Sequence, residues 1–142
     1  MLKLLIAVDG SENALRAVDH LVKNRAWYAA PIEVFLLNVQ TPIAGVNIKL
    51  FIKREDLNAY YHDEGMAVLK DARALLDAAG IQYSHHIGVG HAAEVIAQYA
   101  EAKQCDQIVL GSRGAGSISG MVLGSVVTKV IYLAKAPLLL VK

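Results

Sequence analysis

Ile108-Val109-Leu110-Gly111-Ser112-Arg113-Gly114 carries the most informative pattern of the chain, and Gly124-Ser125 continues it after nine intervening residues. A short apolar run ends in glycine, a loop rich in Gly and Ser follows, and an apolar periodic segment begins near Leu123. That order is strand, loop, helix. Glycines allow the backbone to approach a ligand, and the first N–H groups of a helix are unpaired at the positive end of its dipole. The stretch therefore predicts a phosphate-binding loop.

Two common nucleotide motifs do not explain this loop. Gly111 and Gly116 have the spacing of a P-loop, but Ser117 stands where that motif requires lysine. A dinucleotide fingerprint fails as well, because Ser119 follows Gly114 and Gly116 where Gly or Ala is needed. Residues 88–93 do match G-x-G-x-x-A, but we discount them because residues 82–87 before them are too polar for a central strand.

Strands and helices are predicted to alternate along the whole chain. Continuous apolar runs predict strands buried on both faces, and apolar residues at i, i+3, i+4 and i+7 predict helices. The predicted strands are 3–8, 32–39, 81–89, 107–111 and 137–141, and the predicted helices lie between them, at 14–25, 55–79, 92–103 and 123–133. Such alternation favours a parallel sheet with right-handed crossovers and helices on both faces.

Three segments have local features beyond this alternation of strands and helices. The strand at 81–89 carries polar residues on both faces, which is typical of a sheet edge. Gly80 is expected to end the long helix before it, and Gly65 to weaken that helix midway. Residues 40–54 predict a loop, with room for a turn of helix, across one end of the sheet.

The glycine loop resembles the nucleotide motif of the universal stress protein family, G-x-x-G-x9-G-[ST]. Gly111, Gly114, Gly124 and Ser125 supply its four positions. The segments 6–11 and 136–141 also resemble that family's first and last strands, so the resemblance covers essentially the whole chain. It implies the ATP-binding type of the family and a single Rossmann-like α/β domain over residues 1–142, with an open five-stranded parallel sheet in the order 3-2-1-4-5.

Asp9 is the leading candidate for contact with the nucleoside. It ends a buried strand, where its carboxylate can accept hydrogen bonds from a ribose or an adenine amino group. The resemblance implies that Asp9 lies against adenine and that the backbone of Val39 lies beside the adenine edge. Asp9 could instead only cap the helix that follows. Ser11, in the same loop, is a second candidate for the cap and for ligand contact.

Gly111, Gly114, Gly124 and Ser125 are the candidates for phosphate contact, because Ser125 would begin a helix whose amides can bind an anion. Arg113 could add positive charge, or it could be a solvated loop residue. A Mg²⁺ ion would arrive with the phosphates of ATP, since no carboxylate cluster is evident that would hold one in advance. The alternative is an ordinary surface loop that precedes a helix. Neither a catalytic residue nor a metal ligand is identified.

Composition argues against several partners. The formal net charge of 142 residues is +1, which gives no reason to expect nucleic acid or an anionic membrane as a partner. No apolar run approaches the ~20 residues of a membrane span. A single cysteine, Cys105, excludes an intramolecular disulfide framework. We expect a cytoplasmic protein.

The family resemblance implies an ATP-binding stress-response protein, a nucleotide-dependent switch that forms a homodimer through its last strand. A weak ATPase or adenylyl-transfer enzyme is the alternative. Without a P-loop lysine, an acidic metal site or a general base paired with a nucleophile, any hydrolysis should be slow. An interaction protein that has kept the motif without its ligand is a third hypothesis.

Overall fold

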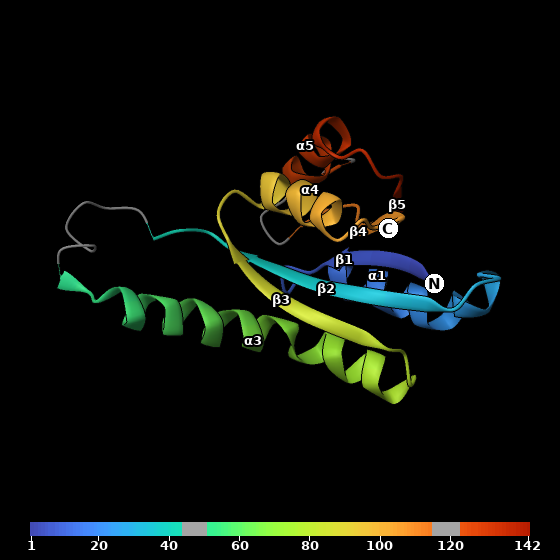
Figure 1. Cartoon of the computed structure of the whole chain (residues 1–142), viewed down its shortest axis with the longest axis horizontal. Coiled ribbons are helices and arrows are strands. Elements are labelled where there is room, and N and C mark those ends of the chain that lie inside the picture. Colours follow the sequence, from blue (N-terminus) through green and yellow to red (C-terminus); the bar gives the residue numbers. More distant parts are fainter. Residues whose placement is uncertain (44–50, 115–122) are drawn as a thin grey trace.

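The computed structural model describes residues 1–43, 51–114 and 123–142. Five parallel strands form one sheet in the order β3-β2-β1-β4-β5, which confirms the predicted architecture (Figure 1). The strands are β1 (Leu2–Ala7), β2 (Ile32–Gln40), β3 (Tyr83–Val89), β4 (Gln107–Gly111) and β5 (Leu138–Val141). The helices are α1 (Glu12–Asn24), α3 (Arg54–Ala78), α4 (Ala92–Ala102) and α5 (Ser125–Leu133), with a 3-10 helix, η1 (Arg25–Trp27), after α1.

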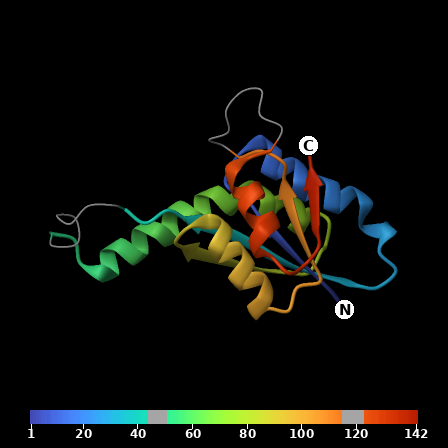
Figure 2. The same ribbon diagram turned by 90° about the horizontal axis from the view of Figure 1, so that it is seen from above.

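The sheet is the middle of three layers. Helices α1 and α3 cover one face, and α4 and α5 cover the other (Figures 1 and 2). The side chains of β1 alternate between the two interfaces: Leu4 and Ile6 pack in the core beneath α1 and α3, whereas Leu5 packs in the core beneath α4 and α5. Because both faces of β1 are buried along Leu4, Leu5 and Ile6, these residues are apolar in succession rather than at every second position.

β1 and β4 lie side by side at the centre of the sheet. Leu5 of β1 pairs with Ile108 of β4, while on its other side Leu5 pairs with Phe35 of β2. The order of the sheet reverses between β1 and β4. The chain therefore continues from β1 to α1 on one face of the sheet and from β4 to α5 on the other, while the two loops begin at neighbouring strand ends. Open α/β sheets bind ligands in the crevice at such a reversal. The fold therefore brings the loop after Ala7 beside the loop after Gly111.

Helix α3 runs without interruption through Gly65, and Gly65 itself is buried. A Cβ at Gly65 would lie 2.6 Å from the side chain of Ile87 on β3. Gly65 therefore allows α3 to lie close against the sheet. The helix ends at Ala78, and Gly80 follows it as the predicted stop, with a φ of +64°, a left-handed conformation that favours glycine.

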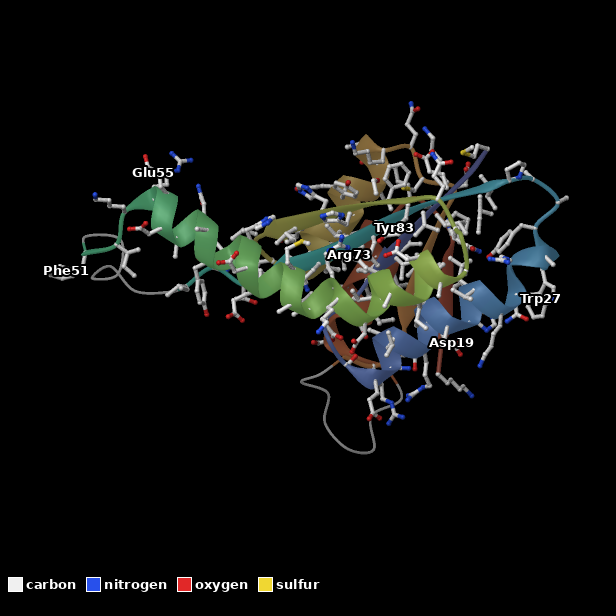
Figure 3. All side chains as sticks on the ribbon, turned by 90° about the horizontal axis from the view of Figure 1, so that it is seen from below. Asp19, Trp27, Phe51, Glu55, Arg73 and Tyr83 are labelled. Atoms are coloured by element: carbon white, nitrogen blue, oxygen red, sulfur yellow. The ribbon has the colours of Figure 1, made fainter. Side chains whose placement is uncertain are left out.

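The edges of the sheet agree with the sequence. β3, the most polar strand, is at one edge, and β5 is at the other. α3 extends past the sheet, with Phe51 and Glu55 at its far end and Trp27 at the opposite end of the molecule (Figure 3). Of the loop predicted at 40–54, residues 44–50 lie outside the described part of the chain, as do Gly116, Ser117 and Ser119 of the second loop. No helix within the described ranges is long and apolar enough to cross a membrane.

Candidate functional site

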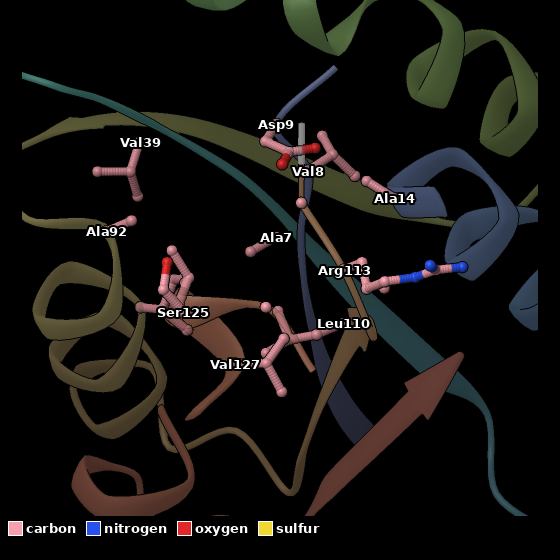
Figure 4. Close-up of a pocket in the computed structure, with 15 residues that line it drawn as sticks. Ala7, Val8, Asp9, Ala14, Val39, Ala92, Leu110, Arg113, Ser125 and Val127 are labelled. Atoms are coloured by element: carbon pink, nitrogen blue, oxygen red, sulfur yellow. The ribbon is translucent and has the colours of Figure 1, made fainter. Parts of the chain in front are cut away.

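A pocket of about 290 Å³ opens at the carboxyl ends of β1 and β4 (Figure 4). Its walls come from the ends of β1, β2 and β4 and from the first turns of α1, α4 and α5. Seven of the eight predicted site residues line it: Asp9, Val39, Gly111, Arg113, Gly114, Gly124 and Ser125. The reversal of strand order thus brings together residues that are more than 100 positions apart in the chain.

Much of the pocket lining is apolar. Ala7, Val39, Ala92, Ile96 and Val127 belong to this apolar part, which we call the slot, and all five side chains are hydrocarbon. An apolar slot of this kind suits a flat ring with hydrogen-bonding groups at its rim. Sequence analysis identified only Val39 among these residues, because helical periodicity marks Ile96 and Val127 as core positions and does not distinguish a pocket wall from a core.

Asp9 stands at the rim of this slot, in the turn between β1 and α1. Its Oδ1 accepts a hydrogen bond of 3.0 Å from the backbone N–H of Ser11. A Cβ on Gly114 would lie 2.8 Å from Asp9 Oδ2, so a glycine at position 114 leaves room for this carboxylate. Asp9 therefore joins the loop after β1 to the loop after β4.

Ser11 has a different position from the other seven residues. Its Oγ accepts a hydrogen bond of 3.1 Å from the N–H of Ala14, which makes Ser11 the N-cap of α1. It lines a second cavity, of about 110 Å³, against α3 rather than the main pocket. The cap role that was open between Ser11 and Asp9 belongs to Ser11, and Asp9 holds the turn.

Three described amides at the two ends of the glycine loop donate hydrogen bonds within the protein. Arg113 N–H donates to Oδ1 of Asn13 at 2.6 Å, and Ser112 N–H donates to the carbonyl of Val141 at 2.8 Å. The N–H of Gly124 donates to the carbonyl of Ser112 at 2.9 Å. These three amides are used within the protein. Among the described residues, the first turn of α5, which begins at Ser125, offers N–H donors for an anion. Gly124 caps that helix without a side chain that would compete for these amides.

The glycines of the motif also serve the fold. A Cβ at Gly111 would lie 2.9 Å from the backbone carbonyl carbon and oxygen of Asn13, so glycine at position 111 lets α1 approach β4. At Gly124 a Cβ would lie 3.3 Å from Gly114 N, against the other end of the same loop. Close approach of backbone to backbone is thus the local reason for glycine at both positions.

Charge in the pocket is sparse. Of the described residues that line it, Asp9 and Arg113 are the ionisable ones. Arg113 is exposed, and Figure 4 shows its side chain directed away from Val39 and Ala92. No group of three or more metal-ligating side chains occurs within residues 1–43, 51–114 and 123–142. The described lining offers an apolar slot, one carboxylate and a helix N-terminus, and each of these can bind part of a ligand.

A model of the universal stress protein family matches residues 1–142. The chain belongs to the universal stress protein family. Among reviewed members, the universal stress protein YxiE of Bacillus subtilis is 30% identical over 145 residues, which cover 99% of this chain and 98% of YxiE. The universal stress protein MJ0531 of Methanocaldococcus jannaschii is 28% identical over 140 residues, which cover 99% of this chain and 81% of the relative.

Solved structures of the family share the fold. That of the M. jannaschii protein MJ0577 has a TM-score of 0.81 at 29% identity and covers 99% of this chain and 94% of its own. A universal stress protein in complex with cAMP has a TM-score of 0.68 at 25% identity and covers 99% of this chain and 96% of its own.

Proposed function

We propose that this universal stress protein binds ATP in the pocket between the ends of β1 and β4. The observation that carries the proposal is the pairing of an apolar slot with the N-terminus of α5 in one pocket of about 290 Å³. The slot matches an adenine ring, and the helix N-terminus matches phosphate. A relative at 25% identity whose structure holds cAMP, an adenine nucleotide, supports the choice of base.

Each proposed contact follows from the position of the residue. Asp9, at the rim, would bind the ribose or the adenine amino group, and the backbone of Val39 would face the adenine edge. Gly111, Gly114 and Gly124 would bring the loop close to the phosphates, where the amide and hydroxyl of Ser125 donate hydrogen bonds. Arg113 would contribute positive charge from the exposed side of the loop. Ser11 would act indirectly, through its hydrogen bond to Asp9.

A Mg²⁺ ion would enter with the nucleotide. Mg²⁺ prefers oxygen ligands and keeps several waters, so the phosphates of ATP together with water would supply its ligands.

Binding rather than turnover is the proposed activity. The described lining contains no lysine or histidine beside Asp9 and Arg113, so an acid–base pair for hydrolysis is missing from that part of the pocket. Any ATPase or adenylyl-transfer activity would be slow. The nucleotide would then act as a signal: its presence sets the conformation of a homodimer that pairs through β5, in the cytoplasm, where ATP is abundant.

Thermal unfolding tests the binding proposal. Nucleotide carried through purification is first removed, and the midpoint is measured alone and with Mg-ATP, AMP or GTP. Ligand at 100 times its dissociation constant adds ~2.7 kcal/mol, which raises the midpoint of a domain of this size by at least several degrees. A rise with ATP that GTP does not give supports an adenine site. No rise with any nucleotide would refute the proposal and favour an interaction protein without ligand.

A further inference from the structure

Asn13 is a buried polar residue in the first turn of α1, with 8% of its surface exposed. Both ends of its amide are used. Oδ1 accepts a hydrogen bond of 2.6 Å from the N–H of Arg113, and Nδ2 donates one of 2.9 Å to the carbonyl of Val141. One partner is in the glycine loop and the other is the last residue of β5. Since one partner is a donor and the other an acceptor, the amide fits in one orientation only.

The network continues from both partners of Asn13. The carbonyl of Val141 accepts a second hydrogen bond, of 2.8 Å, from the N–H of Ser112. The carbonyl of Ser112 in turn accepts the N–H of Gly124, the N-cap of α5, at 2.9 Å. Asn13 therefore lies at the junction of the loop, the start of α5 and the end of the edge strand.

A core role alone would not require asparagine here. The neighbouring buried positions of α1 are apolar, at Ala14, Ala17, Val18 and Leu21. Burial of an amide is costly unless its donors and acceptors are bonded, and Asn13 meets that cost with groups from the loop and from β5. Gly111 also depends on this residue, because a Cβ there would meet the backbone of Asn13 at 2.9 Å.

We infer that Asn13 is a positioning residue that holds the loop at Arg113 in its phosphate-binding shape and couples that loop to the end of β5. The coupling to ligand rests on the proposed function. A nucleotide that shifts the loop changes the hydrogen bond at Arg113, and the same side chain transmits the change to Val141. Linkage makes the effect reciprocal, so a partner that pairs with β5 would change nucleotide affinity by the same factor.

Two substitutions separate the two ends of the side chain. Asn13→Asp keeps an oxygen for the Arg113 N–H and removes the donor to Val141. Asn13→Leu removes both interactions at similar volume. The matched control is Arg16→Ala. Nε of Arg16 donates to the carbonyl of Lys142 at 3.1 Å, so this side chain also ties α1 to the chain end, whereas the Arg113 N–H bonds to Asn13.

Amide hydrogen exchange of the ligand-free proteins measures how often each amide of this network is released from its hydrogen bond. Asn13→Leu should accelerate exchange at Arg113 by about ten-fold or more, because the Arg113 N–H loses its acceptor. It should also accelerate exchange at Ser112, because Nδ2 no longer holds Val141, whose carbonyl accepts the Ser112 N–H. Asn13→Asp should accelerate exchange at Ser112, since a carboxylate oxygen would then face the carbonyl of Val141, and leave Arg113 protected. Arg16→Ala should leave Arg113 unchanged. Unchanged exchange at Arg113 in Asn13→Leu, or at Ser112 in both variants, would overturn the inference. If Asn13→Leu does not fold, the exchange rates of Asn13→Asp alone test the inference.

Nucleotide affinity shows whether the substitution changes the phosphate-binding part of the site. Asn13→Leu should weaken ATP binding by about ten-fold and leave adenosine binding nearly unchanged, because adenosine makes no phosphate contact. Equal losses for ATP and adenosine would mean that Asn13 only supports the fold, and would overturn its role in the site. A wild-type protein that binds no adenine nucleotide refutes the proposed function, whereas the exchange pattern still decides whether Asn13 couples the loop to β5.

Discussion

Gly111 and Gly124 both belong to the sequence motif but have different neighbours in space. A Cβ at Gly111 meets the backbone of α1, which cannot yield without moving the helix. One at Gly124 meets the start of the glycine loop, at Gly114 and Arg113. The backbone of Gly124, with φ of −71° and ψ of 159°, is one that any residue adopts. The two glycines should therefore respond differently to substitution.

Gly124→Val should weaken ATP binding by about ten-fold or more and leave the unfolding midpoint of the ligand-free protein nearly unchanged, because the added side chain displaces the loop rather than the core. Gly111→Ala is the contrast, with a loss of stability of about 1–3 kcal/mol from overpacking. Calorimetric titration and denaturant unfolding measure the two effects. Unchanged ATP affinity in Gly124→Val would remove the loop from the proposed site.

Cys105 should be an unreactive thiol. Burial raises the pKa of this thiol to about 11. The thiolate is the reactive form, and at pH 8 its fraction would be about a hundredth of that of a free cysteine. Alkylation by iodoacetamide at pH 8 should be slower in the folded protein by about that factor and become fast in guanidinium. Equal rates in the folded and unfolded protein would show that burial does not protect Cys105.

At the scale of elements, the contact between α3 and β3 determines how closely a long helix lies on the sheet. Gly65 is a poor helix residue by propensity, by about 1 kcal/mol relative to alanine. Glycine is favoured here for a steric reason, because a Cβ at Gly65 would lie 2.6 Å from the side chain of Ile87. Helix propensity and packing thus make opposite predictions for an alanine at this position.

We expect packing to prevail. Gly65→Ala should lower the free energy of unfolding by about 1–3 kcal/mol, since three carbons of Ile87 lie within 2.7 Å of the new methyl group. Ile87→Ala on the same background should recover part of the loss, and a double-mutant cycle in urea measures the coupling. A stabilised Gly65→Ala protein would mean that α3 shifts on the sheet at little cost.

At the scale of the whole molecule, β5 is an open edge. It pairs with β4 on one side only. Ile108 N–H donates to Pro137 and Ser112 N–H donates to Val141 on that side, so the alternation of a strand directs the amides of Leu138 and Leu140 outward. Helix α5 adds exposed apolar side chains to this C-terminal part of the chain. Among them, Tyr132 has 86% of its surface exposed and Leu133 has 50%. Edges of this kind invite pairing with another strand.

The proposed homodimer follows from this edge. Sedimentation at micromolar concentration should give twice the mass of the chain. Leu140→Pro removes one outward amide, a change that edge strands accept, and should shift the protein to monomer while the pairing with β4 persists. A monomeric wild-type protein, or a Leu140→Pro variant that stays dimeric, would contradict pairing through β5.

From the sequence, the class of fold and seven of the residues that line the pocket could be predicted. Apolar runs such as residues 3–8 predict strands buried on both faces, and a glycine-rich loop before a helix predicts an anion site, because both depend on local pattern. The strand order came from the resemblance to the family and was confirmed by the structure. Local pattern also placed Asp9 and the glycine motif at strand ends, where the loops of a parallel sheet converge.

Tertiary structure alone decided which groups meet. Asn13 has an ordinary helical position in the sequence, and its role emerges only from partners about 100 and 128 residues away. Ala92 and Ile96 read as core residues, yet they form a wall of the pocket. Gly65 reads as a weak point of α3, yet Ile87 makes it a close contact. Each of these depends on distances between segments that are remote in the chain, which periodicity and propensity do not encode.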